Sequence, residues 1–201
     1  MPPAARLPRL EAASLKLGVT DASHPLRLRR VIATRISNTL EKMTMKLYVG
    51  TWILHPIKSG AFAGVLDNGV FKSEPILGFV GDVTVAKLKL VGIISCLERL
   101  KKPSQLTLVT DASDEYVYHC VNEWVAWWRQ NGWKTKSGNV VANQAEVERL
   151  SQLLKTHSVT AAQPQSREDQ TFHDALVATA RNYAFHCERE RRRAYCPRPP
   201  R

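Results

Sequence analysis

An aspartate stands where the sequence pattern could place a carboxylate in an active site. Asp111 follows a short β-prone run at 106–109 and Thr110, and Ala112, Ser113 and Asp114 then supply residues typical of a turn and a helix cap. In α/β sheets, ligands usually bind in the crevice outside the carboxyl ends of the strands. The sequence therefore indicates Asp111 as a candidate site residue.

A tryptophan-rich helical segment follows this aspartate. Trp124, Trp127, Trp128 and Trp133 fall within ten residues of one another. We expect Trp124 and Trp128 to pack their helix onto the sheet, whereas Trp127 would mark a nucleic-acid platform or a protein contact if its ring is exposed. Trp133 stands beside Lys134 and Lys136. An aromatic ring next to lysines on a loop can stack on a base or sugar while the lysines meet phosphates.

The order of these features resembles the ribonuclease H family, specifically its bacterial type-one enzymes. The resemblance covers about residues 46–184 and depends most on the stretch 124–143, which reads WVAWWRQNGWKTKSGNVVAN. In that family, the corresponding helix and basic protrusion, the handle, grip the DNA strand of an RNA/DNA hybrid. The resemblance places Trp133, Lys134 and Asn143 in this nucleic-acid-binding region, and the residue types add Trp127 and Lys136 as candidate binding residues.

The same resemblance implies a metal-dependent chemistry, but two of the residues that this chemistry needs are replaced. Enzymes of the family hold two Mg²⁺ ions around the scissile phosphate with four carboxylates. Asp111 and Asp174 match two of these, so they are the candidate catalytic and metal-binding residues, for Mg²⁺ or Mn²⁺. The other two positions are occupied by Gly50 and Lys89. Two negative charges are lost and one positive charge is gained, so a metal pair would be poorly neutralised.

Other family features are also altered. Thr84 matches a threonine that contacts the nucleic-acid backbone, but the paired asparagines that should follow are Val85 and Ala86. Asp82 is the one acid that could stand in for a missing carboxylate on this helix. The family's histidine-bearing loop corresponds to residues 163–169, which contain no histidine. We expect Lys89 to lie near Asp111 or Asp174, in a cleft that accepts a phosphate but does not activate water.

The hydrophobic pattern predicts strands at 46–54, 60–66, 70–76, 106–109 and 158–162, with a tight turn at Asn68-Gly69 joining the second and third. It predicts helices at 82–102, in the tryptophan-rich segment after Asp114, at 143–157 and from 167 to 195. The resemblance implies an α/β ribonuclease H-like fold. Its mixed five-stranded sheet has three antiparallel strands followed by parallel ones and is flanked by helices.

The charge is concentrated at the two ends of the chain. The net charge is +11, yet residues 1–42 carry eight Lys and Arg against three Asp and Glu, and residues 181–201 carry seven against two. We predict a basic, disordered extension at 1–42, a ribonuclease H-like domain at 43–184, and an Arg-rich helix end and tail at 185–201. Attraction to phosphates then comes mostly from the ends.

The cysteines and the hydropathy bear on location. The four cysteines show no paired metal-binding spacing, and no apolar run approaches the roughly 20 residues needed to span a bilayer. These features favour a cytoplasmic, reducing compartment without membrane attachment. Residues 1–42 are nevertheless Arg-rich and acid-poor, a composition that overlaps with organelle transit peptides.

Three functions follow as hypotheses. The first is a nucleic-acid-binding protein that recognises RNA/DNA hybrid or duplex without efficient hydrolysis. The second is an active or weakly active ribonuclease H that cleaves the RNA of a hybrid. The third is a protein-interaction scaffold on the same fold.

Overall fold

The computed structural model describes residues 45–110 and 115–195, with the backbone alone for Tyr195. The strands are β1 (Met45–Leu54), β2 (Ser59–Asp67), β3 (Ile76–Val80), β4 (Gln105–Val109) and β5 (Ser158–Ala162). The helices are α2 (Val85–Leu97), α3 (Glu115–His119), the π-helical turn η1 (Cys120–Trp124), α4 (Val125–Gln130), α5 (Gln144–Thr156) and α6 (Arg167–Tyr195). Asp111 lies outside the described residues, as do 1–42.

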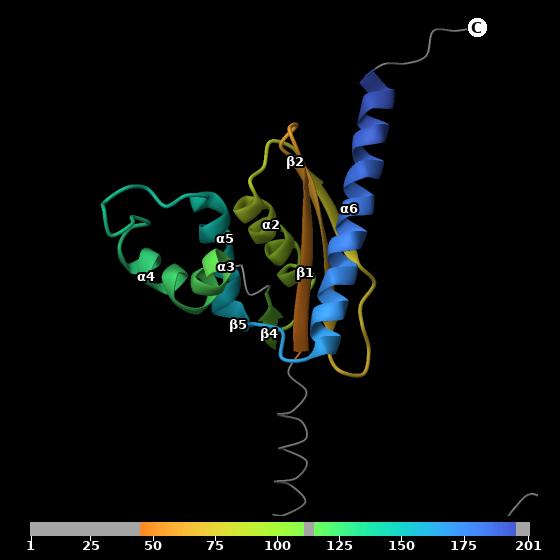
Figure 1. Cartoon of the computed structure of the whole chain (residues 1–201). Coiled ribbons are helices and arrows are strands. Elements are labelled where there is room, and N and C mark those ends of the chain that lie inside the picture. Colours follow the sequence, from red (N-terminus) through yellow and green to blue (C-terminus); the bar gives the residue numbers. More distant parts are fainter. Residues whose placement is uncertain (1–44, 111–114, 196–201) are drawn as a thin grey trace, which may run out of the picture. The chain divides into compact units, whose positions relative to one another are not determined.

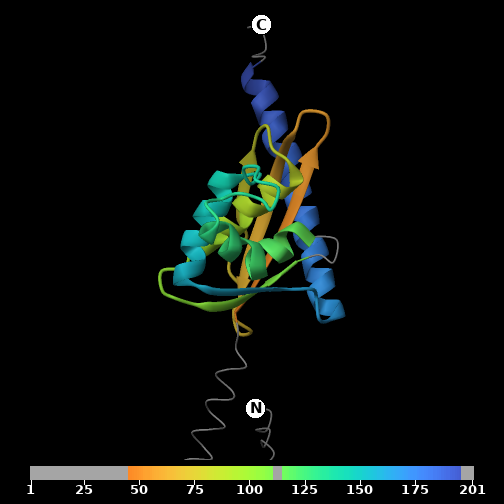
Figure 2. The same cartoon turned by 90° about the vertical axis from the view of Figure 1, so that its left-hand side faces the viewer.

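The five strands form one mixed sheet in the order β3-β2-β1-β4-β5. β1 pairs with β2, and β2 with β3, in antiparallel fashion, whereas β1 with β4, and β4 with β5, are parallel. This arrangement confirms the predicted fold class. Helices α2 to α5 cover one face of the sheet and α6 crosses the other, as two perpendicular views show (Figures 1 and 2).

Side chains of β1 alternate between two cores, as the pleat of a strand requires. Leu47 and Val49 belong to the larger core, with the buried residues of α2 and α5. Tyr48 points to the opposite face, where it packs with Leu176 and Ala180 of α6. Gly50 and Trp52 share the α6 side by the same alternation, so α6 lies directly over the strand that carries Gly50.

The third strand is displaced from its predicted position. The turn at Asn68-Gly69 is present, but residues 68–75 form a loop and β3 begins only at Ile76. Asn68 Oδ1 accepts hydrogen bonds from the amides of Val70 and Phe71, and Asp67 Oδ1 accepts one from Gly69. These bonds satisfy the amides locally, and Pro75 has no amide to donate, so a regular ladder starts after it.

Helix α2 is shorter than the predicted 82–102. It begins after Thr84, which caps it by accepting a hydrogen bond from the amide of Lys87 at 3.3 Å. It ends with tighter hydrogen bonds from Arg99 to Cys96 O and from Leu100 to Leu97 O. Asp82 lies before the helix, in a left-handed conformation with φ of 47°.

Candidate nucleic-acid interface and carboxylate positions

Gly50 lies in close contact with the backbone of α6. A Cβ placed on Gly50 would lie 2.4 Å from Val177 N, 2.5 Å from Leu176 C and 2.9 Å from Leu176 O. These separations are far below van der Waals contact, and backbone atoms in the middle of a helix cannot rotate away. Any side chain at this position would therefore force α6 off the sheet.

A buried ionic cluster fixes the beginning of α6 against β1. Asp169 is only 4% exposed, and its Oδ1 accepts hydrogen bonds from Lys46 Nζ at 2.8 Å and Tyr48 Oη at 2.5 Å. Its own amide donates to Ser166 Oγ at 3.0 Å, and its Oδ2 accepts from the amide of Gln165 at 3.3 Å. The carboxylate thus joins the helix start, the preceding loop and the strand.

The hydrogen bonds of this cluster change the acidity of Asp169. Burial by itself raises the pKa of the carboxyl, but the hydrogen bonds with Lys46, Tyr48 and Ser166 outweigh it and lower the pKa from 3.8 to about 2. Burial and the neighbouring carboxylate together raise the pKa of Tyr48 well above its usual value. Asp169 is therefore an anion held in place by the fold.

Asp174, one turn further along α6, has a different environment. Its side chain is 65% exposed and accepts a hydrogen bond from Gln170 Nε2 at 3.0 Å. His173 Nδ1 lies 3.9 Å from the same oxygen, and its ring is buried.

The strand that precedes Asp111, β4, is present as predicted. Thr110 follows this strand and is buried, and its amide donates a hydrogen bond to Ala162 O at 3.0 Å. Asp111 hence directly follows the carboxyl end of a paired strand.

On α2, Lys89 is half-buried between the fully buried Leu88 and Leu90. Thr84 and Val85 are exposed at the start of the same helix. The neighbouring Lys87 forms an ion pair with Glu146 of α5 at 3.2 Å. The two lysines of α2 thus lie in its first half, and its capping threonine has a structural role.

The predicted aromatic helix is continuous from Glu115 to Gln130 but contains the π-helical turn η1 at Cys120–Trp124. Such a turn rotates the following side chains relative to a regular helix, and it is frequent at functional sites. Trp128 is 8% exposed, and Trp124 is half-buried, stacked on His119 with ring centroids 5.0 Å apart. Trp127 is exposed at 37%.

The loop after this helix folds back by backbone hydrogen bonds. The amide of Trp133 donates to Trp128 O at 2.8 Å, and the amide of Val141 donates to Trp133 O at 3.1 Å. Lys134 and Lys136 are exposed. Asn143 is half-buried in a left-handed conformation, with φ of 56°, at the start of α5.

A pocket of about 710 Å³ lies between the helix and this loop. Its lining residues are Glu123, Trp124, Trp127, Trp128, Thr135 and Lys136. Trp133, in contrast, is half-buried and packs against the main core. Of Trp127 and Trp133, the two predicted binding rings, Trp127 is therefore the one that lines this pocket with Lys136.

A family comparison decides the identity of the fold. The family model described as RNase H matches residues 47–163 of the chain. The chain belongs to the ribonuclease H family. The matched residues include β1 to β5, α2 and the handle, whereas α6 with Asp169 and Asp174 follows them.

Curated ribonucleases H are similar over part of their length. That of Jannaschia sp. (strain CCS1) is 35% identical over 91 residues, which are 45% of this chain and 57% of the relative. That of Francisella tularensis subsp. novicida (strain U112) is 35% identical over 102 residues, which are 50% of this chain and 64% of the relative. The chain thus spans less than two thirds of either relative.

Solved structures share the fold. The RNase H domain of the foamy virus PFV has a TM-score of 0.57 at 14% identity, and the match covers 70% of this chain and 94% of that domain. The foamy viral protease-reverse transcriptase in complex with RNA/DNA hybrid has a TM-score of 0.59 at 14% identity, covering 73% of this chain and 21% of that one. At this level of identity, the similarity concerns the fold alone.

The resemblance assigns two metal-binding carboxylates to positions where this chain has no acidic side chain. Gly50 has no side chain and no room for one, and Lys89 has a cationic side chain. Within 45–110 and 115–195, no three His, Cys, Asp or Glu side chains gather as metal ligands would.

The helices of residues 45–110 and 115–195 were also compared with the length and hydropathy of membrane spans, and none is long and apolar enough to cross a membrane.

Sequence reasoning missed Asp169. The acid follows Ser166 by three residues, which is the spacing of a helix capping box, and this signal was available. Its partners Lys46 and Tyr48 lie more than 120 residues away, however, and only the sheet topology brings them to the helix start.

Proposed function

We propose that this ribonuclease H-family protein binds nucleic acid, an RNA/DNA hybrid or another duplex, without efficient hydrolysis of the RNA strand. The observation that carries the proposal is the contact between Gly50 and the α6 backbone. It supports the absence of a carboxylate from this strand position, because the helix that crosses the strand fills the space that a side chain would need. The family's metal-ion chemistry needs that carboxylate, so we assign no catalytic step to this chain.

Electrostatics also support the binding of nucleic acid by this chain. Relative to the family pattern, the exchange to Gly50 and Lys89 removes two negative charges and adds a positive one. A phosphate backbone, which carries a negative charge at every nucleotide, is attracted by such a change rather than repelled. In this proposal, Lys89 attracts the phosphate backbone of the nucleic acid and performs no proton transfer.

The handle supplies the second part of the surface. Trp127 and Lys136 line one pocket, and Lys134 is exposed two residues before Lys136. The lysines would contact phosphates, and the exposed ring would contact a sugar or base. Preference among hybrid, duplex RNA and duplex DNA would come from this part, since phosphate contacts alone carry no such information.

Binding is tested by fluorescence anisotropy with matched hybrid, RNA and DNA duplexes. The variant Trp127→Ala/Lys134→Gln/Lys136→Gln spares Trp133, whose ring packs against the core. The control Phe71→Ala/Lys101→Gln/Lys102→Gln makes the same changes at exposed positions elsewhere. We expect the handle variant to lose the preference among duplexes and to lower the salt slope by roughly 2, for two phosphate contacts. A handle variant that binds all three duplexes as the control does would refute the role of the handle.

A further inference from the structure

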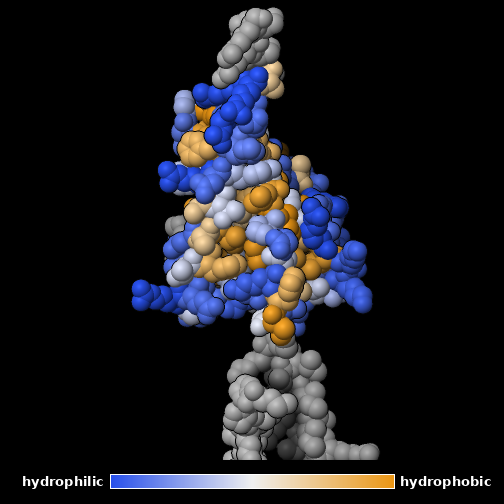
Figure 3. All heavy atoms as spheres, turned by 90° about the vertical axis from the view of Figure 1, so that its right-hand side faces the viewer, coloured by the Kyte–Doolittle hydropathy of each residue, from blue (hydrophilic) through white to orange (hydrophobic). Residues whose placement is uncertain are grey.

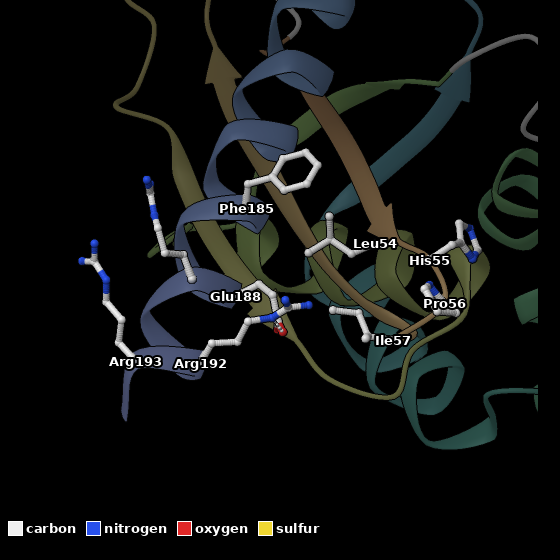
Figure 4. A pocket seen from close by; sticks show the side chains of 9 residues that line it. Leu54, His55, Pro56, Ile57, Phe185, Glu188, Arg192 and Arg193 are labelled. Carbon is white, nitrogen blue, oxygen red and sulfur yellow. Dashed lines mark hydrogen bonds and ion pairs between the residues drawn. The ribbon is translucent and has the colours of Figure 1, made fainter. Parts of the chain in front are cut away.

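The end of α6 carries a pocket that the proposed function does not use. It has a volume of about 570 Å³ and lies between α6 and the end of β1 with the turn that follows (Figure 4). Leu54, Pro56 and Ile57 line it from the strand side, and Phe185, Arg189, Arg192 and Arg193 line it from the helix. The volume falls within the roughly 300–1,000 Å³ typical of ligand sites.

The helix residues of this pocket share one face. Positions 185, 189, 192 and 193 have the spacing i, i+4, i+7 and i+8, which places them in one stripe. Phe185 is 51% exposed, an unusual state for a phenylalanine whose helix packs on a sheet. The end of α6 is hydrophilic, with apolar surface beside it, in the view of this face (Figure 3).

A buried glutamate holds one of the pocket arginines, Arg192, in place. Glu188 is 7% exposed, and its Oε1 accepts a hydrogen bond from Arg192 Nε at 3.0 Å. Arg191 Nε lies 3.2 Å from its other oxygen. The Arg192 side chain is still 72% exposed, so its guanidinium is oriented and remains open to an anion. Arg193 Nη1 also pairs with Glu190 Oε1 at 2.8 Å, so the three pocket arginines face two glutamates and leave a net charge of +1.

We infer that this pocket binds a single-stranded nucleic-acid segment, with an unpaired base against Phe185 and the adjoining phosphates against Arg189, Arg192 and Arg193. An aromatic ring beside arginines is the combination that binds single strands. A paired base is enclosed in the duplex stack and cannot reach the ring, whereas an unpaired base can. An acidic peptide would satisfy the arginines but leave Phe185 without a stacking partner.

The site is separate from the handle. α6 covers the face of the sheet opposite to α4 and α5, so the two surfaces do not compete for the same strand (Figures 1 and 2). The inference extends the proposed function to the unpaired flank of a bound duplex. The two proposals can fail separately. Single-strand affinity is measured with oligo(U) and oligo(dT), whereas the preference of the handle is measured with duplexes.

The test uses the full chain and fluorescein-labelled oligo(U) and oligo(dT) of about twelve nucleotides, a length within the usual footprint of single-strand sites. Arg189→Gln/Arg192→Gln/Arg193→Gln should weaken single-strand binding at least about tenfold, and Phe185→Ala should weaken it about tenfold through lost stacking. The control Lys101→Gln/Lys102→Gln/Lys155→Gln, at exposed positions elsewhere, should change it less than about threefold.

Three results would overturn the inference. The first is an equal loss in the lysine control, which would indicate unspecific charge attraction. The second is unchanged binding by Phe185→Ala together with full competition by poly-glutamate, which would indicate an acidic protein partner. The third result comes from the unmodified chain, so the folding of variants plays no role. In this experiment, 4-thiouridine-labelled oligo(U) is cross-linked to the protein by ultraviolet light, and cross-links to peptides of the handle alone would overturn the inference. Cross-links to the peptide that contains Phe185 would support it.

Discussion

At the scale of single residues, Gly50 and Asp169 decide how α6 meets the sheet. Gly50 permits a contact between helix backbone and strand that no other residue allows, and Asp169 fixes the helix start by accepting hydrogen bonds from Lys46 and Tyr48. The sequence indicates that a carboxylate is missing at Gly50, but it does not indicate that the space is filled.

Gly50→Ala should destabilise the protein by about 3 kcal/mol, because its Cβ would overpack against the α6 backbone. Urea unfolding followed by tryptophan fluorescence measures this change. Gly81→Ala is the matched control, since the nearest atom to its Cβ would be Ser59 Oγ at 4.0 Å, and it should be nearly neutral. A tolerated Gly50→Ala would show that α6 does not approach the strand as described.

The same close contact between Gly50 and the α6 backbone bears on metal binding. Because it leaves no room for a side chain, the double variant Gly50→Asp/Lys89→Glu should not restore a metal site.

Asp169 makes stability depend on pH in the acid range. Its pKa is about 2 in the folded chain against 3.8 without the fold, so its contribution is complete above pH 3.8 and is lost as pH falls toward 2. At about 1.4 kcal/mol for each pKa unit, Asp169→Asn should cost about 2 kcal/mol at pH 7 and about half of that at pH 3.

Urea unfolding at both pH values measures the difference. Glu98→Gln is the control, because its ion pair with Arg149 at 2.8 Å is exposed and should contribute less than about 1 kcal/mol. A cost for Asp169→Asn that is the same at pH 7 and pH 3 would contradict the ionic role of the cluster.

At the scale of elements, the sequence predicts what depends on local pattern. Four of the five strands and the order of the helices follow from hydrophobic periodicity, and α6 reaches Tyr195 as expected. The third strand was misplaced because Asn68 and Pro75 act through particular hydrogen bonds and a missing amide, which periodicity does not contain. The π-helical turn at Cys120–Trp124 likewise has no clear signal in the sequence.

The candidate site was only partly predictable for a related reason. Carry-over by position needs only residue identity, and its assignment of Gly50 and Lys89 to the altered carboxylate positions stays a prediction. The exposure of each tryptophan depends on the rotation of α4 and on the path of the loop that follows. The sequence favours Trp133 as a binding ring, whereas the structure places its side chain in a half-buried position.

At the scale of the whole molecule, charge is distributed unevenly. Residues 43–180 carry 14 Lys and Arg against 13 Asp and Glu, counted from the sequence, whereas residues 1–42 carry an excess of five positive charges. We predict that removing residues 1–42 weakens binding to every duplex and flattens the salt slope but leaves the ranking among duplexes unchanged. Anisotropy over a salt series measures this. A changed ranking would mean that residues 1–42 read the form of the nucleic acid.

The central claim concerns binding without hydrolysis. It is tested most directly by incubating the full chain with a labelled RNA/DNA hybrid in Mg²⁺ and, separately, in Mn²⁺, at concentrations where binding is saturated. We predict no cleavage of the RNA strand above the background without protein, because the chain has no carboxylate at Gly50 and a lysine at position 89. Metal-dependent cleavage that is abolished by Asp111→Asn would contradict the account and establish the chain as an active ribonuclease H.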